Sequence, residues 1–327
     1  MEFLNDPVMG KPVWMWVAFI AVVLTLLVVD LGLFHRKTRE ISISESLWMS
    51  AFYIIIALAF GGWIWSSLGP QSGKEYITGF LVEKTLAMDN VFVISLIFTY
   101  LAIPRQYQHR VLFWGILGVI VLRAIMIGLG ATLVAEFSWV LYLFAAFLIA
   151  TGIKMLVMDH KDPDIANNPV LKFLRKRMRI SPDLHQEKFF VKYPDPATGK
   201  IVRWATPLFV ALILVEIVDI IFAVDSVPAI FAITTDPYIV YTSNIFAILG
   251  LRALYFALAA VIGRFIYLKQ ALALVLVFIG SKVFIADLMG WEKFPASISL
   301  GITVALIAGG VIYSLLRTRS TQQQYSA

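Results

Sequence analysis

Nine stretches of mainly apolar residues, each about 20 residues or longer, restrict this chain to one class of fold. They cover residues 13–34, 47–68, 77–102, 111–133, 138–158, 206–233, 239–261, 268–288 and 295–316. A helix of about 20 apolar residues crosses a bilayer, and backbone exposed to lipid must be helical or close into a barrel. Only 15% of the residues are charged, against about 25% in soluble domains. We predict an all-α integral membrane protein with about nine transmembrane helices in a single domain over residues 13–316.

The basic residues predict how the chain is oriented. Lys and Arg gather at 35–46, 103–110 and 159–205, at 262–269 and in the tail at 317–327, whereas each intervening loop carries at most one. Because cytoplasmic loops are enriched in Lys and Arg, we expect the N-terminus outside and the C-terminus in the cytoplasm. The net charge of +6 is then a topology signal, and we expect no nucleic-acid partner.

The loop at 159–205 carries ten basic residues and has two predicted features. Asn168 to Ile180 mixes apolar and basic residues in a pattern typical of an amphipathic helix on the anionic inner leaflet. A simple topology anchor is the alternative. Residues 189–193 and 201–204 flank a turn-rich segment and predict a small hairpin.

Five carboxylates lie inside the apolar stretches, where lipid would otherwise surround them. They are Glu83, Asp89, Glu216, Asp219 and Asp225. An ionisable group at that depth costs about 2.5–3.5 kcal/mol by insertion scales and commonly marks an ion path or a proton relay. The alternative is that they form buried pairs with Arg123 and Arg252 that only hold the helices together.

The acidic motifs belong to a longer internal repeat. Glu83 and Asp89 are six residues apart, as are Asp219 and Asp225. In both halves the motif is followed by Ile-Leu-Gly, then Leu-Arg-Ala, then Gly-x-Lys, at 116–118, 122–124 and 152–154 and at 248–250, 251–253 and 280–282. Spans 3–5 and 6–8 therefore form two three-helix repeats. An odd number of spans makes the second copy enter from the opposite face, which predicts an inverted repeat with a site at its interface.

The residue types in these spans predict which ligand such a site would take. Carboxylate and amide oxygens suit Mg²⁺, Ca²⁺ and Mn²⁺, and Asn90 and Asn244 can add amide oxygens. The chain has no cysteine, and its four histidines fall in predicted cytoplasmic loops or at their edges. We therefore expect no buried zinc or copper site. Lys84, Lys154 and Lys282 lie nearer span ends, where a lysine can reach the interface.

Helical geometry ranks the acids. Glu216 and Asp219 share a face, but Asp225 lies about 120° away on a straight helix. Pro228 can break that helix and let its acids converge. We predict Asp89 and Asp225 as core ligands, with Asp219 and Glu216 next. Glu83 is left with three roles, as a gate, a proton relay or the partner of an arginine.

These motifs resemble a known family. The segments carrying them are Glu83-Lys-x5-Asp89-Asn90, Glu216-x2-Asp219-x5-Asp225-Ser-x-Pro228 and Asn244-x-Phe-Ala-Ile-Leu-Gly-Leu-Arg252. They are similar to the signature of the TerC/Alx family of bacterial inner-membrane proteins, and the resemblance runs from about 14 to 316, closer to the Alx type. It implies a LysE-like transporter superfamily member that exports manganese, with the family's acidic positions falling on the five carboxylates. Other labels in the family are tellurium resistance and redox modulation.

We therefore predict a non-enzymatic inner-membrane transporter that exports divalent cations, with Mn²⁺ as the first candidate and no permanently bound cofactor. Its partners are the lipid bilayer and the metal ion, and a homo-oligomer or membrane partners are left open. One alternative is a non-transporting factor for redox modulation, tellurium resistance or metalation of exported enzymes. The other is an exporter of amino acids or organic cations.

Overall fold

The computed structural model describes residues 2–32, 42–157, 165, 168–194, 199–259, 268–291 and 293–325. Its long elements are helices, with a 3-10 turn and two small hairpins. The elements are η1 (Glu2–Asn5), β1 (Pro7–Val8), β2 (Lys11–Pro12), α1 (Val13–Gly32), α2 (Ile43–Leu68), α3 (Pro70–Tyr100), α4 (Arg105–Glu136), α5 (Val140–Val157), α6 (Pro169–Arg177), β3 (Phe190–Pro194), β4 (Ile201–Ala205), α7 (Pro207–Ile233), α8 (Pro237–Leu249), α9 (Leu251–Ala259), α10 (Leu268–Leu288) and α11 (Ala296–Tyr325).

Proline and capping residues mark where several helices begin. α3, α6, α7 and α8 each carry a proline in the first turn, where its missing N–H is not needed and its fixed φ suits a helix. The side chain of Asp236 accepts from the Tyr238 amide at 3.0 Å and caps α8. Gly69, at φ 92°, joins α2 to α3, a left-handed conformation that glycine adopts without steric cost.

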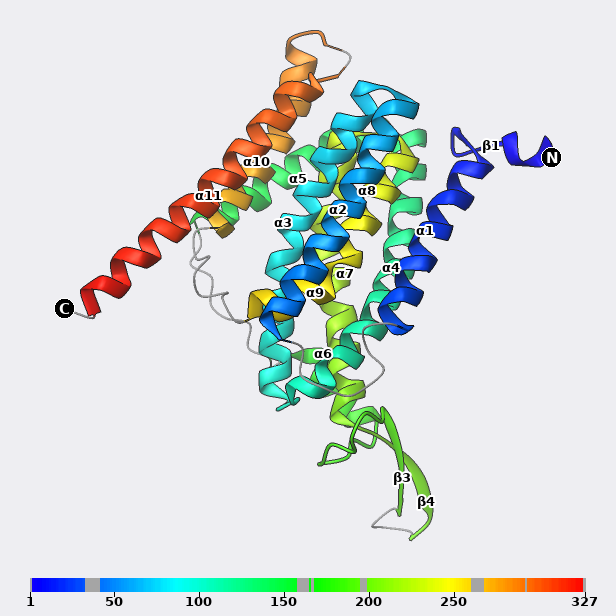
Figure 1. The fold of residues 1–327 in the computed structure, drawn as a ribbon, viewed down its shortest axis with the longest axis vertical. Coiled ribbons are helices and arrows are strands. Elements are labelled where there is room, and N and C mark those ends of the chain that lie inside the picture. The colour runs from blue at the N-terminus through cyan, green and yellow to red at the C-terminus, as the bar shows by residue number, and fades with distance from the viewer. Residues whose placement is uncertain are drawn as a thin grey trace.

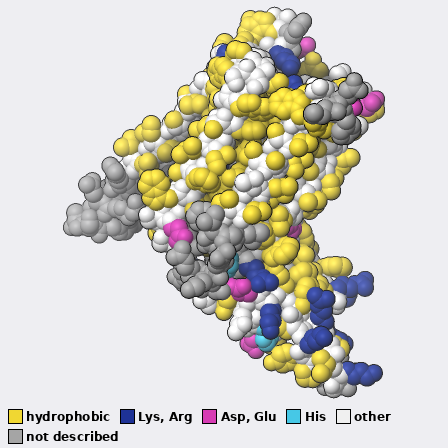
Figure 2. All heavy atoms as spheres, turned by 45° about the vertical axis from the view of Figure 1, so that its right-hand side comes forward, with side chains coloured by type: hydrophobic (Ala, Val, Ile, Leu, Met, Phe, Trp, Pro, Cys, Tyr) yellow, Lys and Arg dark blue, Asp and Glu magenta, His cyan; other side chains and the backbone are white. Residues whose placement is uncertain are grey.

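The helices have the composition of membrane spans. Within the described ranges, α2, α4, α5, α7, α10 and α11 are long and apolar enough to cross a bilayer, and α1 and α8 contain shorter apolar stretches. α3 is 31 residues long but carries Glu83, Lys84 and Asp89 in its apolar part. Figure 2 shows hydrophobic side chains covering the helical body and Lys and Arg gathered around the β3–β4 end. A large apolar surface of this kind is rare on soluble monomers and fits a lipid environment.

α3 and α7 lie together at the centre of the bundle (Figure 1). α3 packs on α8 and α7 packs on α4, so each central helix is covered by a neighbour from the other half of the chain. α5 packs on α10, α11 covers α10, and α1 lies at the opposite edge against α8. The β3–β4 hairpin projects from one end of the bundle (Figure 1).

Two glycines bring α5 and α10 into close contact. A Cβ on Gly152 would lie 2.7 Å from the Ala273 carbonyl oxygen and 2.6 Å from a Val277 methyl. A Cβ on Gly280 would lie 2.5 Å from the Ala145 carbonyl oxygen and 2.8 Å from Ile149. The two sets of contacts match position for position, because each glycine meets the residues seven and three before the other. The crossing therefore has local two-fold symmetry.

Two of the predicted spans differ from the structure. The helix expected to break at Pro228 is continuous, because α7 runs through Pro228 from Pro207 to Ile233. The predicted span at 239–261 is instead two helices, α8 and α9, which meet at Gly250. The close approach of the Lys84 side chain to Gly250 accompanies this interruption.

Both features predicted in the long loop, the hairpin and the basic helix, are present in the structure. The predicted hairpin is confirmed as β3 and β4, which pair antiparallel with Phe190 opposite Ala205. α6 is the predicted basic helix, capped by Asn168. Leu171 and Leu174 are buried in the cluster that includes Leu208 and Leu214 of α7, whereas Phe173 is exposed.

Candidate functional site

A buried guanidinium joins the two acidic motifs at the centre of the bundle. Arg123 on α4 is 1% exposed. Its Nη1 donates to Glu83 Oε1 on α3 at 2.5 Å and to Ser226 Oγ on α7 at 2.6 Å. Its Nε and Nη2 face the two carboxylate oxygens of Asp219 on α7, both at 3.4 Å. We call Glu83, Arg123, Asp219 and Ser226 the Arg123 cluster.

Burial explains why these groups are paired. Glu83 is 2% exposed and Asp219 is 6% exposed. A charge removed from water without a partner costs several kcal/mol, and the planar guanidinium fork can satisfy two carboxylates at once. Of the three roles left open for Glu83, the structure contains the pairing with an arginine, Arg123.

Further oxygens lie beside the cluster without hydrogen-bond partners. Asn90 donates its amide to Asp219 Oδ1 at 3.3 Å, and its own oxygen is buried and unpartnered. Glu216, one turn before Asp219, lies within its electrostatic reach, and its Oε2 is likewise buried and unpartnered. Gly118 on α4 faces that carboxylate, because a Cβ there would lie 2.6 Å from Glu216 Oε2. Buried oxygens of this kind are rarely left unsatisfied in proteins.

Asp225 lies away from the Arg123 cluster. Its side chain hydrogen-bonds Thr151 and lies near Lys154, both on α5. This is the direction expected from the straight helical wheel, since α7 does not break to redirect it. Asp225 and Asp219 therefore occupy different sides of α7, and the expectation that a break at Pro228 lets them converge is wrong.

Other predicted site residues lie apart or outside the described side chains. The backbone of Asp89 and Arg252 belongs to α3 and α9, but the placement of both side chains lies outside the described residues. Asn244 on α8 is fully buried with both amide atoms unpartnered. No described hydrogen bond joins it to the Arg123 cluster.

Two of the three lysines predicted to reach the membrane interface from span ends are instead buried. Lys84 is 7% exposed and donates to the Ala247 carbonyl oxygen at 3.0 Å, near the C-terminal end of α8. Lys282 is 4% exposed and donates to Ser299 Oγ at 3.1 Å. Lys154 remains exposed on α5. Neighbouring helices close over the first two lysines, which local hydropathy does not reveal.

The site is acidic, and the buried guanidinium of Arg123 neutralises part of its negative charge. Among the described side chains, no three His, Cys, Asp or Glu residues are grouped so as to hold a metal ion. Arg123 pairs with Glu83 and Asp219, and Glu216 lies one turn before Asp219 on α7, which leaves two negative charges if all three carboxylates are ionised. Carboxylate and amide oxygens are ligands for hard divalent cations. Arg123 lies where it would compete with such a cation for Glu83 and Asp219.

Sequence reasoning overlooked three contributors to this region. Ser226 follows Asp225 in the second motif, and its place seven residues after Asp219 puts both on one face of α7. Gly118 is part of the repeated Ile-Leu-Gly, yet its contact with Glu216 needs the packing of α4 on α7. Thr151 carries no sequence signal for its hydrogen bond to Asp225.

Known proteins similar to this chain are membrane proteins. An uncharacterized membrane protein of Rickettsia bellii is 48% identical over 94% of this chain and 99% of its own length. A similar protein of Myxococcus xanthus is 45% identical over 96% and 95%. A Photorhabdus laumondii protein, named as a membrane-bound redox modulator, Alx, is 43% identical over 94% and 95%. No solved structure matches the chain. The model of the integral membrane protein TerC family matches residues 68–322. The chain therefore belongs to the TerC family of integral membrane proteins.

Proposed function

We propose that this protein is a bacterial inner-membrane secondary transporter that exports hard divalent cations, with Mn²⁺ as its first candidate substrate. The cation would bind beside the Arg123 cluster, between α3, α4 and α7. Glu83, Asp219 and Glu216 would supply carboxylate oxygens and Asn90 an amide oxygen. Asp89 and Asp225 remain proposed ligands or steps along the path.

The observation that carries this proposal is the unbalanced charge at the Arg123 cluster. Two buried oxygens have no hydrogen-bond partner. One is Oδ1 of Asn90, whose amide nitrogen donates to Asp219, and the other is Oε2 of Glu216, one turn before Asp219 on α7. A purely structural ion pair needs neither of them, because Arg123 already satisfies Glu83 and Asp219. A divalent cation would neutralise the remaining charge and occupy these oxygens.

Arg123 has a defined part in this proposal. It would hold Glu83 and Asp219 compensated while no cation is bound, and the incoming cation would displace it. This exchange would limit the cost of leaving two carboxylates uncompensated in a low-dielectric interior. It would also couple the binding of a cation to a movement of α4 relative to α3 and α7.

The proposed topology has nine spans, with α8 and α9 together forming the seventh. α3–α5 and α7–α10 would be inverted repeats, with the N-terminus outside and the C-terminus in the cytoplasm. The matched contacts of Gly152 and Gly280 support the repeat. So does the reciprocal packing of α3 on α8 and of α7 on α4. Inverted repeats of this kind commonly place a transport site at the membrane midplane.

Purified protein in liposomes loaded with a dye quenched by Mn²⁺ tests the proposal. We expect saturable Mn²⁺ flux that falls about tenfold or more in Asp219→Asn and in Glu216→Gln, since each variant removes a charged ligand. Glu136→Gln is the matched control, because Glu136 is exposed at the end of α4. An absence of Mn²⁺ flux, or equal rates in all three variants, would refute transport through this site.

A second candidate is a non-transporting membrane factor in redox modulation, tellurium resistance or metalation of exported enzymes. It is favoured by the name of the Photorhabdus relative and by the basic hairpin outside the bundle (Figures 1 and 2). The chain has no cysteine, so its own thiols cannot carry a redox step. Lys192→Gln with Arg203→Gln tests this reading. Unchanged Mn²⁺ flux with loss of the cellular phenotype would support it.

Export of an amino acid or organic cation is the other alternative. It is separated from cation export by competition in the same liposomes. A basic amino acid that blocks Mn²⁺ flux, or is itself carried, would favour this reading.

A further inference from the structure

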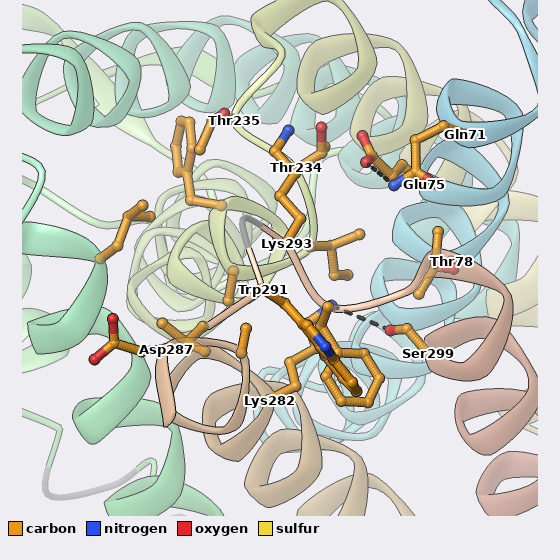
Figure 3. Close-up of a pocket in the computed structure, with 18 of the residues that line it drawn as sticks. Gln71, Glu75, Thr78, Thr234, Thr235, Lys282, Asp287, Trp291, Lys293 and Ser299 are labelled. Carbon is orange, nitrogen blue, oxygen red and sulfur yellow. Dashed lines mark hydrogen bonds between the residues drawn. The ribbon is translucent and has the colours of Figure 1, made fainter. Parts of the chain in front are cut away.

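A cavity away from the Arg123 cluster lies at the end of the bundle opposite the hairpin. Its volume is about 390 Å³, and it is bounded by the start of α3, the end of α7, α10 and the start of α11 (Figure 3). An apolar layer that includes Val82, Ala229 and Ile279 lies beside it in the core. The volume falls in the range of small-molecule sites, about 300–1,000 Å³.

Two buried groups of opposite charge line this cavity. Glu75 is 5% exposed and accepts from Gln71 Nε2 at 2.7 Å. Lys282 is 4% exposed and donates to Ser299 Oγ at 3.1 Å. The two lie close enough to interact electrostatically, yet they are not among the described ion pairs, whose N···O distances are 2.5–3.4 Å.

This separation is informative because direct contact would be the usual arrangement. Burying two charges costs several kcal/mol each, and their mutual attraction recovers most when they touch. Here each is held by a neutral partner, Gln71 or Ser299, at a different part of the cavity wall (Figure 3). A molecule lying between them could interact with both.

The charges also exclude simpler ligands. A metal cation at Glu75 would be repelled by the Lys282 ammonium, and a lone anion at Lys282 would be repelled by Glu75. A neutral molecule with one group of each sign meets neither obstacle. The remaining wall combines polar residues and an exposed acid and lysine, Asp287 and Lys293, with an aromatic and apolar part. Phe231, Trp291 and Phe294 belong to that part, and the last two meet edge to face at 5.8 Å.

We infer that this cavity binds a small zwitterionic solute, with its anionic group at Lys282, its ammonium at Glu75 and an apolar body against the aromatic wall. This site does not depend on cation transport at the Arg123 cluster. The chemistry could be supplied by a free amino acid or by the ammonium and phosphate of a phosphatidylethanolamine headgroup. The absence of any contact between the two charges in the described structure favours a ligand small enough to lie between them, so we commit to the free solute.

The first test varies the ligand and leaves the protein intact. Detergent-purified protein is titrated calorimetrically with L-leucine and with γ-aminobutyrate, which differ in the separation of their charges. Leucinamide lacks the carboxylate and N-acetyl-leucine lacks the ammonium. We expect saturable binding of at least one zwitterion, weakened about tenfold or more by either modification, because each removes one charge-assisted hydrogen bond.

The second test varies the protein. Glu75→Gln and Lys282→Met should each weaken the same binding about tenfold or more, whereas Lys269→Met at the other end of α10 should not. The double variant Glu75→Lys with Lys282→Glu keeps the buried charges balanced and should bind the zwitterion better than either single variant. This control separates loss of binding from loss of folding. No zwitterion binding, binding indifferent to these residues, or binding seen only in phosphatidylethanolamine nanodiscs would overturn the inference.

Discussion

Gly118→Ala tests the role of Glu216 without changing any charge. A Cβ on Gly118 would lie 2.5 Å from Glu216 Cδ and 2.6 Å from Oε2, whereas ordinary contacts begin at 3.4 Å. Because Glu216 Oε1 lies closer still to that position, the carboxylate must retreat by more than about 0.9 Å. Metal–ligand distances hold within about 0.2 Å. A retreat of this size would take Glu216 out of any ligand set that it shares with Asp219.

The same substitution should leave the fold intact. The side chain that must move is the end of a flexible glutamate, and alanine is a better helix former than glycine by roughly 0.5–1 kcal/mol. We expect Gly118→Ala to unfold at an unchanged or slightly higher temperature in detergent. Its Mn²⁺ flux in liposomes should fall about tenfold or more, towards that of Glu216→Gln.

Gly115→Ala is the matched control on the same helix. A Cβ there would meet Val215 at 3.5 Å, an ordinary contact, so its flux should equal that of the unsubstituted protein. The double variant Gly118→Ala with Glu216→Gln should be no slower than Glu216→Gln alone, because both changes remove the same interaction. Equal flux in Gly118→Ala and Gly115→Ala would refute the assignment of Glu216 to the cation site.

Three further outcomes are expected. Arg123→Ala should destabilise the protein by about 3–5 kcal/mol, since it leaves two buried carboxylates uncompensated; chemical denaturation in detergent measures this, and a loss below about 1 kcal/mol would contradict the described pairing. Gly280→Ala should destabilise by about 1–3 kcal/mol through its clash with the α5 backbone, whereas Gly301→Ala, with open space around it, should not; equal melting temperatures would contradict the close crossing. Because the chain has no cysteine, single introduced cysteines can report its topology. An impermeant thiol reagent should label Ser138→Cys from outside intact cells, and it should label Lys200→Cys only after the cells are opened. The reverse pattern would refute the predicted orientation.

Most helix positions were predictable because hydropathy is a local property. The predicted span at 268–288 coincides with α10, and the first span, at 13–34, begins with α1 at Val13 and matches it through Gly32, the last described residue of that segment. The hairpin was predictable for the same reason, since turn residues separate two short apolar runs. The interruption at Gly250 was missed because the residues around it remain apolar. The break predicted at Pro228 was wrong, because tertiary packing keeps α7 continuous through this proline.

Partners of the buried charges were less predictable. The sequence indicated that Arg123 was available to an acid, but the choice of Glu83 and Asp219 depends on three helices meeting at one depth. The same holds for Lys282, whose counterpart in the repeat, Lys154, stays exposed. Repeats with similar sequences therefore place equivalent lysines in different environments, because α11 covers α10 and its Ser299 meets Lys282.

Composition, apolar length and residue order along the chain were enough to predict a helical membrane protein with carboxylates in its spans. The TerC family was indicated by the resemblance of its motifs. The packing of the helices was needed to show that Asp219 faces Arg123 while Asp225 faces Thr151, and that Glu75 and Lys282 border a separate cavity. The physical reason is that a side chain's partner is set by the rotation and depth of each helix against its neighbours.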